Sequence, residues 1–538
     1  MWTKLTKKVT ISLENKVIKL REERSLITRF LLILGSRPQL VPKLEDVIGK
    51  YEMSIVPRSL AAVDGSLYLP TDKSYLMKII EGGQSEKYKS YTNEDINVHR
   101  VLIVDAMEVL QSITKTPKMK RVIHLQEEFI ARITNLLKYY EKGRIVFDRY
   151  LDQSLKNKTR NKRAQTVTSY AVHPQMTLNM SIKELLSSSS TKRLLTNIIA
   201  KATLEHFAEI STEIVIVYDD KIVSSENVQF HTQEEADQLI PHQILACQEK
   251  YRGSNKPLHI DISSPDTDVL ILCVDLVSNG RLSCNTELRF ITGKNTKNTL
   301  RRVVDVKSRV NVLGKSKAKA LIGFHNFTGA DWGGKFVGIS KQRWCDAFIQ
   351  LPDESPVLEA FSIMGQVDLP QELQDDKLPP EVASMEAFVC TVYSPNGPKT
   401  ISELRWELFR TKNSEGEMLP PTCSSLLPHI MRVNFISRRD KSYTELNPSL
   451  PPLERNGWQI QDGVYSPLLS ISLPAPKAVI ELTKCSCKKT ACLKNCSCYK
   501  NGLTCTPICK CNTEVLCENI IRNQNTASDD CDDMSDSD

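Results

Sequence analysis

The chain has 538 residues, of which 41% are hydrophobic and 25% are charged, proportions typical of a soluble globular protein with roughly two to four domains. Its longest early apolar run, residues 30–35, is far shorter than the ~20 residues that a membrane-spanning helix needs. We therefore expect a protein that is neither secreted nor membrane-inserted. The net charge of +7 permits a polyanionic partner without requiring one.

The first half of the chain changes character near residue 98. Residues 1–97 read as a partly helical N-terminal extension, with a helix expected over 14–35. From 98 to 351, short β-branched runs alternate with longer helix-compatible stretches, which is typical of parallel strands joined by crossover helices. The strands are expected at 101–105, 144–148, 213–219 and 257–263. The pattern predicts an α/β fold, with three layers and a mostly parallel central sheet.

The second half divides by composition. An acidic, Pro-containing linker is expected at 352–384, followed by an accessory region at 385–476. That region holds a helix around 402–409 and then a Pro-rich stretch, 418–476, which we expect to be irregular. A Cys-rich module at 477–520 precedes a tail at 521–538, whose last ten residues hold six Asp, and we expect the tail to be disordered.

Acidic residues recur where the expected strands end or the following helices begin. They are Asp105, Asp148, Glu234, Glu235, Asp237, Asp266, Asp268 and, in a Gly-rich turn, Asp331. Each one alone could simply cap a helix or complement its dipole. The carboxyl ends of parallel strands meet at one edge of a sheet, however, and carboxylates converging there could hold two Mg²⁺ or Mn²⁺ ions ~4 Å apart.

The order and spacing of these acids resemble the flap endonuclease and XPG-like 5′ nucleases, which have a PIN-like fold. The resemblance covers about half of the chain and implies a set of catalytic metal ligands: Asp105, Asp148, Glu235, Asp237, Asp266, Asp268 and Asp331. It also implies that the basic segment 154–163 is a helix near the active site. In that helix Lys156 and Arg163 would steady the scissile phosphate, and Lys158, Arg160 and Lys162 would bind further phosphates.

Two features depart from the nuclease pattern. The stretch 333–343, "GGKFVGISKQR", lies where that family has a helix-two-turn-helix that grips duplex DNA, and Ser340 stands in place of a glycine of its turn. In this sequence 104 residues precede Asp105, the first of the predicted metal ligands, whereas flap-cleaving members of the family begin close to the active site. The resemblance therefore implies no 5′-end handling here.

Nine of the sixteen cysteines lie within a short C-terminal block that contains no histidine. They are Cys485, Cys487, Cys492, Cys496, Cys498, Cys505, Cys509, Cys511 and Cys517. If three of the thiolates bridge two metals each, nine cysteines satisfy about three tetrahedral Zn²⁺ ions. The C-x-C rhythm resembles the CXC domain of tesmin-like proteins, which implies DNA contacts. The residues expected to make them are Lys488, Lys489, Lys494, Tyr499, Lys500 and Lys510.

The combined features favour a divalent-metal-dependent nuclease that hydrolyses DNA phosphodiester bonds, with the zinc module adding DNA affinity. Two alternatives stay open: a catalytically silent DNA-binding or chromatin adapter, and an RNA-cleaving PIN-like enzyme. The whole chain also resembles animal proteins associated with mobile elements that pair a PIN-like domain with a CXC block. We expect a nuclear location, with the cytoplasm as the alternative.

Overall fold

The structure is a computed structural model. It describes residues 8–13, 16–21, 25–70, 72–83, 86–89, 91, 97–150, 168–210, 212–225, 227–293, 301–330, 332–412, 418–461, 464–480, 485–487, 492, 496–501, 503, 505, 509–511 and 518–519. No helix within these ranges is long and apolar enough to cross a membrane.

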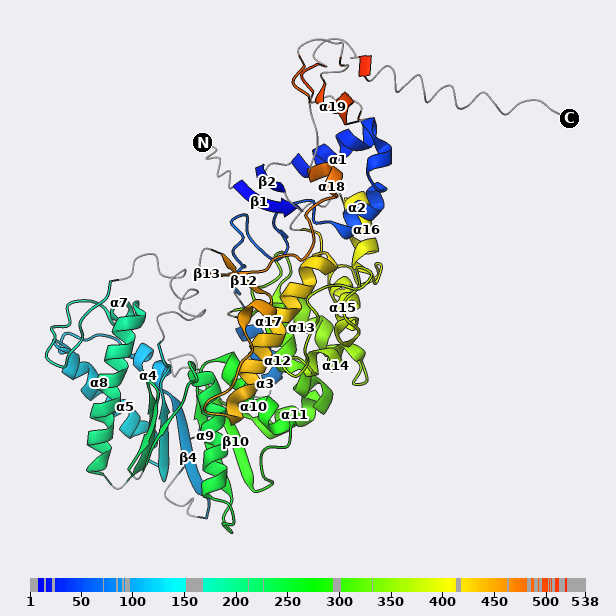
Figure 1. Cartoon of the computed structure of the whole chain (residues 1–538). Helices are drawn as coiled ribbons and strands as arrows, with labels where there is room; N and C mark the ends of the chain where they lie inside the picture. The colour runs from blue at the N-terminus through cyan, green and yellow to red at the C-terminus, as the bar shows by residue number, and fades with distance from the viewer. Residues whose placement is uncertain are drawn as a thin grey trace.

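A nine-stranded sheet, counted over the described residues, lies in the lower part of the molecule in Figure 1, in the order β3-β11-β10-β9-β4-β5-β6-β7-β8. Neighbours among β10, β9, β4, β5 and β6 run parallel, and the outer strands pair antiparallel. The bounds are β3 (Glu86–Lys87), β4 (His99–Asp105), β5 (Lys142–Val146), β6 (Glu213–Tyr218), β7 (Lys221–Ser224), β8 (Val228–Phe230), β9 (Leu258–Ser263), β10 (Thr286–Thr292) and β11 (Arg302–Asp305). The α/β fold class with a mostly parallel sheet is confirmed.

The central strands are apolar on both faces, which explains why their sequences read as continuous β-branched runs. In β4, Val101 and Ile103 join the core on one side of the sheet, whereas Leu102 and Val104 join the core on the other. All four side chains are at most 2% exposed. Helices must therefore cover both faces, giving the three layers expected from the sequence.

Two groups of helices provide those layers, with α5 and α8 on one side of the sheet and α9 and α10 on the other (Figure 1). The first layer contains α4 (Ala106–Ser112), α5 (Val122–Leu137), α7 (Ile182–Leu185) and α8 (Ser189–Ala208). The second contains α3 (Ser74–Glu81), α9 (Ala236–Lys250), α10 (Thr267–Ser278), α11 (Val306–Leu313) and α12 (Lys315–Gly329).

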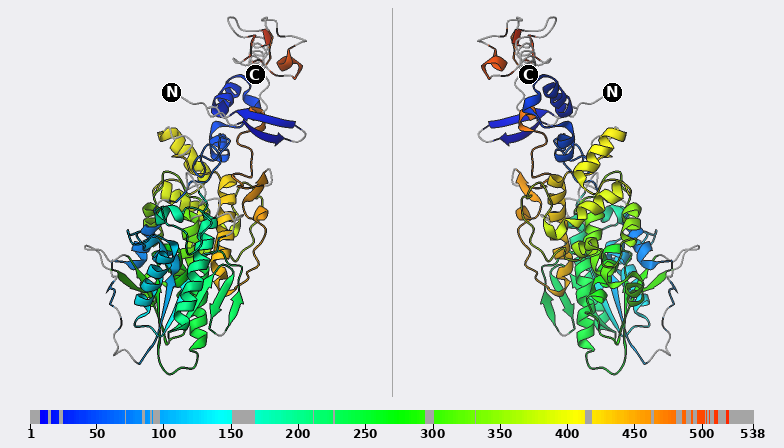
Figure 2. Two further views of the ribbon diagram at one scale, coloured as in Figure 1. Left: turned by 90° about the vertical axis from the view of Figure 1, so that its left-hand side faces the viewer. Right: turned by 90° about the vertical axis from the view of Figure 1, so that its right-hand side faces the viewer.

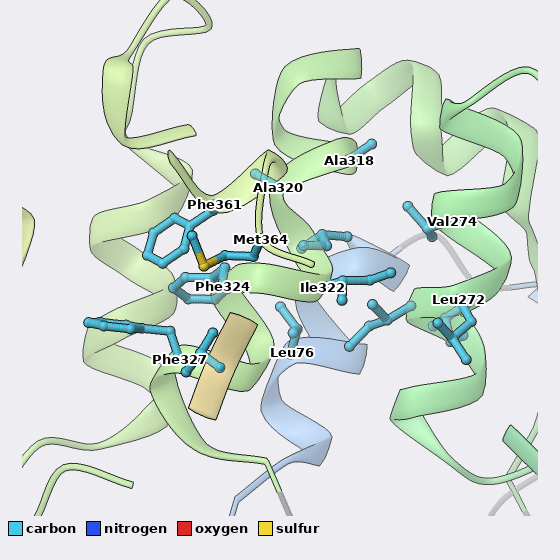
Figure 3. Packing of buried hydrophobic residues seen from close by; sticks show 14 of the residues in the cluster. Leu76, Leu272, Val274, Ala318, Ala320, Ile322, Phe324, Phe327, Phe361 and Met364 are labelled. Atoms are coloured by element: carbon cyan, nitrogen blue, oxygen red, sulfur yellow. The ribbon is translucent and has the colours of Figure 1, made fainter. Parts of the chain in front are cut away.

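The core between the sheet and helices α9, α10 and α12 continues away from the sheet into a group of further helices. They are α13 (Lys341–Ile349), α14 (Pro356–Ser362), η2 (Pro380–Val382), α15 (Ser384–Tyr393), α16 (Ile401–Lys412), α17 (Cys423–Lys441), η4 (Ser442–Thr444) and η5 (Leu453–Arg455). Phe324 and Phe327 of α12 pack against Phe361 of α14 in this core (Figure 3). A Cβ at Gly323 would clash with the carbonyl oxygen of Phe361, so glycine allows the two helices to approach this closely.

Residues 26–53 and 475–480, the latter at the junction of the accessory region and the Cys-rich module, form a third, smaller core beyond α16 (Figures 1 and 2). Phe30 and Val47 pack there with Val479, and Arg405 forms a buried ion pair with Glu52 at 3.5 Å. The remaining elements are β1 (Lys8–Leu13), β2 (Lys16–Arg21), α1 (Ser25–Ser36), η1 (Pro38–Leu40), α2 (Leu44–Lys50), β12 (Trp458–Gln461), β13 (Val464–Pro467), α18 (Lys477–Ile480) and α19 (Ser497–Lys500).

Two expectations about local structure are wrong. The helix expected over 14–35 exists only as α1, because the alternating pattern of residues 8–21 forms the antiparallel pair β1 and β2 instead. The stretch expected to be irregular contains the 19-residue helix α17, which accommodates Pro428 in its second turn. Burial of Leu427, Ile430 and Met431 fixes this helix despite the proline.

Candidate functional site

The sheet changes winding direction at β4, because the chain passes from β4 to β5 and β6 on one side and places β9 and β10 on the other. Such a switch leaves a crevice at the carboxyl ends of the strands. Asp105 ends β4, Asp148 lies two residues beyond β5, and Asp266 lies three residues beyond β9. The fold thus brings acids from three strands to one edge.

Asp105 caps helix α4 and is crowded by other acids. Its Oδ1 accepts hydrogen bonds from the backbone nitrogens of Met107, at 3.0 Å, and Glu108, at 3.3 Å. The hydroxyl of Ser264 donates to its Oδ2 at 3.2 Å. Burial, followed by the nearby charge of Asp148, raises the pKa of Asp105 to about 7. Because a cation would relieve this repulsion, the donor set fits a metal ion.

Asp148 connects the end of β5 to the start of α9. Its Oδ1 accepts a hydrogen bond from the backbone nitrogen of Ala236, the first residue of α9, at 3.0 Å. Glu235 is the N-cap residue of that helix and Asp237 lies in its first turn. The acids predicted from separate segments of the sequence, Asp148 and the Glu235–Asp237 pair, are therefore neighbours.

Asp266 and Asp268 stand at the start of α10. Asp266 is the N-cap residue, and its Oδ1 accepts the backbone N–H of Asp268 at 3.0 Å. Asp237, Asp266 and Asp268 each offer a carboxylate oxygen within 4.8 Å of the other two. Oxygens on opposite sides of a Mg²⁺ ion lie about 4.2 Å apart, so these three could bind one ion after a shift of less than ~1 Å.

Asp268 has two basic neighbours that the sequence did not reveal. Lys73 Nζ lies 3.0 Å from its Oδ2, and His325 Nε2 lies 2.9 Å from its Oδ1. Burial opposes ionisation of Asp268, yet Lys73 and His325 together hold the pKa of this carboxyl well below its usual range. Lys73 is 195 residues away in sequence, so spacing alone carries no signal for the contact.

Behind His325 lies the buried amine of Lys341. Lys341 Nζ is 3.3 Å from His325 Nδ1 and donates to the Thr328 hydroxyl at 2.7 Å. Burial lowers the pKa of Lys341 to about 7 and also lowers the pKa of His325. Ser340, the residue that departs from the nuclease pattern, caps α13 by accepting the Arg343 backbone N–H at 3.2 Å.

The accessory region also contributes to the site through α17. Arg439 Nη1 lies 3.2 Å from Glu235 Oε1, and Arg439 Nη2 lies 2.7 Å from Asp440 Oδ1. Its guanidinium sits 4.0 Å from the centroid of the Trp332 ring. One pocket is lined by residues from both regions, among them Glu235, Asp237, Trp332 and Arg439. The only sequence signal for Arg439 was a basic cluster within a stretch expected to be irregular.

Another acid next to the site was also missed. Glu108, in the first turn of α4, accepts a hydrogen bond from the Ser263 hydroxyl at 3.0 Å. Several predicted residues lie outside the described part of the chain. They are the metal ligand Asp331 and the basic residues Lys156, Lys158, Arg160, Lys162 and Arg163.

The C-terminal cysteines form a compact cluster of sulfurs. Two groups of four could each hold a metal ion, and Cys485 and Cys505 belong to both. The Sγ of Cys485 lies 3.8 Å from that of Cys492 and 3.9 Å from that of Cys505. Sulfurs bound at ~2.3 Å to a tetrahedral zinc ion lie about 3.8 Å apart, so the spacing fits zinc with bridging thiolates.

Part of the predicted DNA-contacting surface can be placed. Tyr499 and Lys500 lie on α19, where Tyr499 is 41% exposed, and Lys500 and Lys510 are exposed. Cys487 and Cys511 are described beside the two groups of four. Cys517, Lys488, Lys489 and Lys494 lie outside the described residues.

No family model and no curated protein matches the sequence. Among solved structures, the chain is similar to the catalytic core of Rad2 in complex with DNA substrate, with 15% identity, a TM-score of 0.29, and coverage of 50% of this chain and 66% of that chain. It is similar to flap endonuclease-1 from Methanococcus jannaschii, with 13% identity, a TM-score of 0.28, and coverage of 53% of this chain and 83% of that chain. The chain is also similar to the T5 D15 protein co-crystallised with metal ions, with 13% identity, a TM-score of 0.27, and coverage of 64% of this chain and 99% of that chain.

Proposed function

We propose that the protein is a divalent-metal-dependent nuclease with a PIN-like catalytic domain that hydrolyses phosphodiester bonds in DNA. The observation that carries this proposal is the convergence of Asp105, Asp148, Asp237, Asp266 and Asp268 at the switch point of the sheet. Three of their carboxylates lie close enough to bind one ion. Glu235 adjoins them and is held by Arg439.

The catalytic ions, two Mg²⁺ or Mn²⁺, would activate water and stabilise the charge of the leaving oxygen. The role of the protein is to hold the carboxylates in place before substrate arrives. Asp105, Asp148 and Asp266 are fixed by backbone N–H groups, since each accepts one or two hydrogen bonds from the start of a helix. Asp331, Lys156 and Arg163 complete the proposed set, the last two as phosphate ligands.

The zinc module is proposed to increase DNA affinity. Exposed Tyr499, Lys500 and Lys510 support this role, because an aromatic ring and ammonium groups suit bases and phosphates. About three zinc ions, the CXC relationship, a nuclear location and a mobile-element origin stay predictions from the sequence, as does binding of RNA.

The nuclease proposal is tested with flapped, nicked and single-stranded DNA, and with single-stranded RNA, in Mg²⁺ or Mn²⁺. The variant Asp266→Asn keeps an oxygen that can cap α10 but loses the charge of a candidate ligand. Asp305→Asn is a matched control, because Asp305 caps α11 in the same way, through the Ser308 backbone N–H at 3.1 Å, and is exposed.

We expect Asp266→Asn to lower the cleavage rate by at least ~100-fold and Asp305→Asn to leave it unchanged. Cleavage of RNA alone would favour the RNA-cleaving alternative. Equal rates for wild type and Asp266→Asn would contradict catalysis at this site and leave the silent DNA-binding adapter as the better explanation.

A further inference from the structure

Lys73 reaches the acidic site from the N-terminal region. It precedes α3, and its ammonium pairs with Asp268 Oδ2 at 3.0 Å, although both side chains keep contact with solvent, at 21% and 24% exposure. Asp268 is one of the three acids that could bind a single metal ion. A divalent cation bound to Asp268 would therefore share this carboxylate with Lys73.

The position of Lys73 is set by packing on both sides. The following helix α3 buries Leu76, Met77 and Ile80 in the core shared with the sheet. The preceding segment is tied to the loop before α13, because the backbone nitrogen of Val337 donates to the carbonyl oxygen of Ser59 at 2.9 Å. The backbone around Lys73 is therefore held against the sheet core, which places its side chain within reach of Asp268.

Lys73 also lines a polar hollow. Its walls include Asp72, Lys73, Lys335 and Lys341, together with Thr328 and Ser340. Lys73 and Lys335 supply two ammonium groups against the carboxylate of Asp72, and Lys341, whose pKa burial lowers to about 7, adds a partial positive charge. Lys341 donates to the Thr328 hydroxyl and to the His325 carbonyl oxygen at 3.1 Å, so its amine is held in the wall.

We propose that Lys73 is an exchangeable counter-ion that neutralises Asp268 in the unloaded site and binds a nucleic-acid phosphate in the adjacent hollow once a divalent ion occupies Asp268. The proposal rests on the proposed nuclease function. The Lys73 ammonium, which lies 3.0 Å from Asp268 Oδ2, would be repelled by a dication bound to the same carboxylate. Its flexible four-carbon stem lets it turn into the hollow, where Lys335 adds a second positive charge.

The exchange has a consequence for metal affinity that does not depend on catalysis. Calorimetric titration of Mn²⁺ into the DNA-free protein should show about ten-fold tighter binding for Lys73→Gln than for wild type, since the competing cation is gone. Lys335→Gln is the matched control, because Lys335 lines the same hollow, whereas the ammonium that pairs with Asp268 Oδ2 is that of Lys73. Its Mn²⁺ affinity should equal that of wild type.

Binding of a labelled duplex DNA in Ca²⁺ tests the second half of the proposal. Both lysine variants should bind DNA several-fold more weakly, and the salt dependence of binding should fall by about one phosphate contact. Equal or weaker Mn²⁺ binding by a Lys73→Gln variant with the wild-type melting temperature would overturn the exchange. Unchanged DNA affinity would overturn the phosphate site. Absence of Mn²⁺ binding in all three proteins would instead refute the nuclease proposal itself.

Discussion

Replacing Asp105 by asparagine should stabilise the metal-free protein at pH 8, although it removes a candidate metal ligand. The Asn side chain keeps an oxygen for the backbone N–H groups of Met107 and Glu108. It loses the charge and replaces Oδ2, the acceptor of the Ser264 hydroxyl, by an NH2 group. A pKa of about 7, compared with the ordinary 3.8, corresponds to ~4 kcal/mol of unfavourable charging in the native state. Because Asp105 is half-buried and keeps some contact with water, we expect about half of this, ~2 kcal/mol.

The pH dependence follows from the sign of the shift. The native pKa of Asp105 is raised, so its contribution to stability is fully present below the unfolded value of 3.8 and is lost as pH rises through about 7. The gain from Asp105→Asn should therefore be largest at pH 8 and fall to less than half of that value by pH 5.

Thermal unfolding in EDTA, with and without excess Mn²⁺, measures both effects. Asp105→Asn should melt at a higher temperature than wild type in EDTA and show a smaller rise when Mn²⁺ is added. The control Asp305→Asn, an exposed helix cap outside the site, should show neither change. If Asp105→Asn melts below wild type at pH 8 in EDTA, the acids do not repel one another and the reasoning fails.

Three further predictions concern other parts of the molecule. Burial lowers the pKa of His429 to about 3, so stability should fall by ~2 kcal/mol between pH 7 and pH 5 as the unfolded histidine becomes protonated, and urea denaturation of His429→Gln should show a flatter pH dependence. Arg439→Met should lower the free energy of unfolding by about 3 kcal/mol, because it removes the buried counter-charge that pairs with Glu235 and Asp440. As a control, Arg132→Met removes an exposed pair with Glu128 and should lower the free energy of unfolding by less than ~1 kcal/mol. Cys485→Ser should lose more zinc per chain by mass spectrometry than Cys492→Ser, since Cys485 belongs to both groups of four and Cys492 to one; equal losses would argue against bridging.

The strands that carry the site could be predicted because the hydrophobic pattern that defines them depends only on residues adjacent in sequence. Continuous β-branched runs such as 101–104 are typical of strands buried on both faces of a covered parallel sheet. An acid ends β4, and one follows each of β5 and β9 within three residues. The hairpin of β1 and β2 and the helix α17 were missed for local reasons as well. Alternation of apolar and polar residues over 8–21 favours the hairpin, whereas Pro428 disfavours a helix that burial of its apolar residues stabilises.

The sequence by itself determined the kind of chemistry available: oxygen ligands for hard cations at the strand ends and a dense thiolate cluster at the C-terminus. The identity of side chains fixes which metals they prefer, and this does not depend on the fold. Only the tertiary structure decided which charges face those acids. Lys73 and Arg439 lie 195 and 204 residues from their carboxylate partners, and the packing of α3 and α17 against the sheet core places them there. Coulomb energy depends on that distance in space, which residue order does not give.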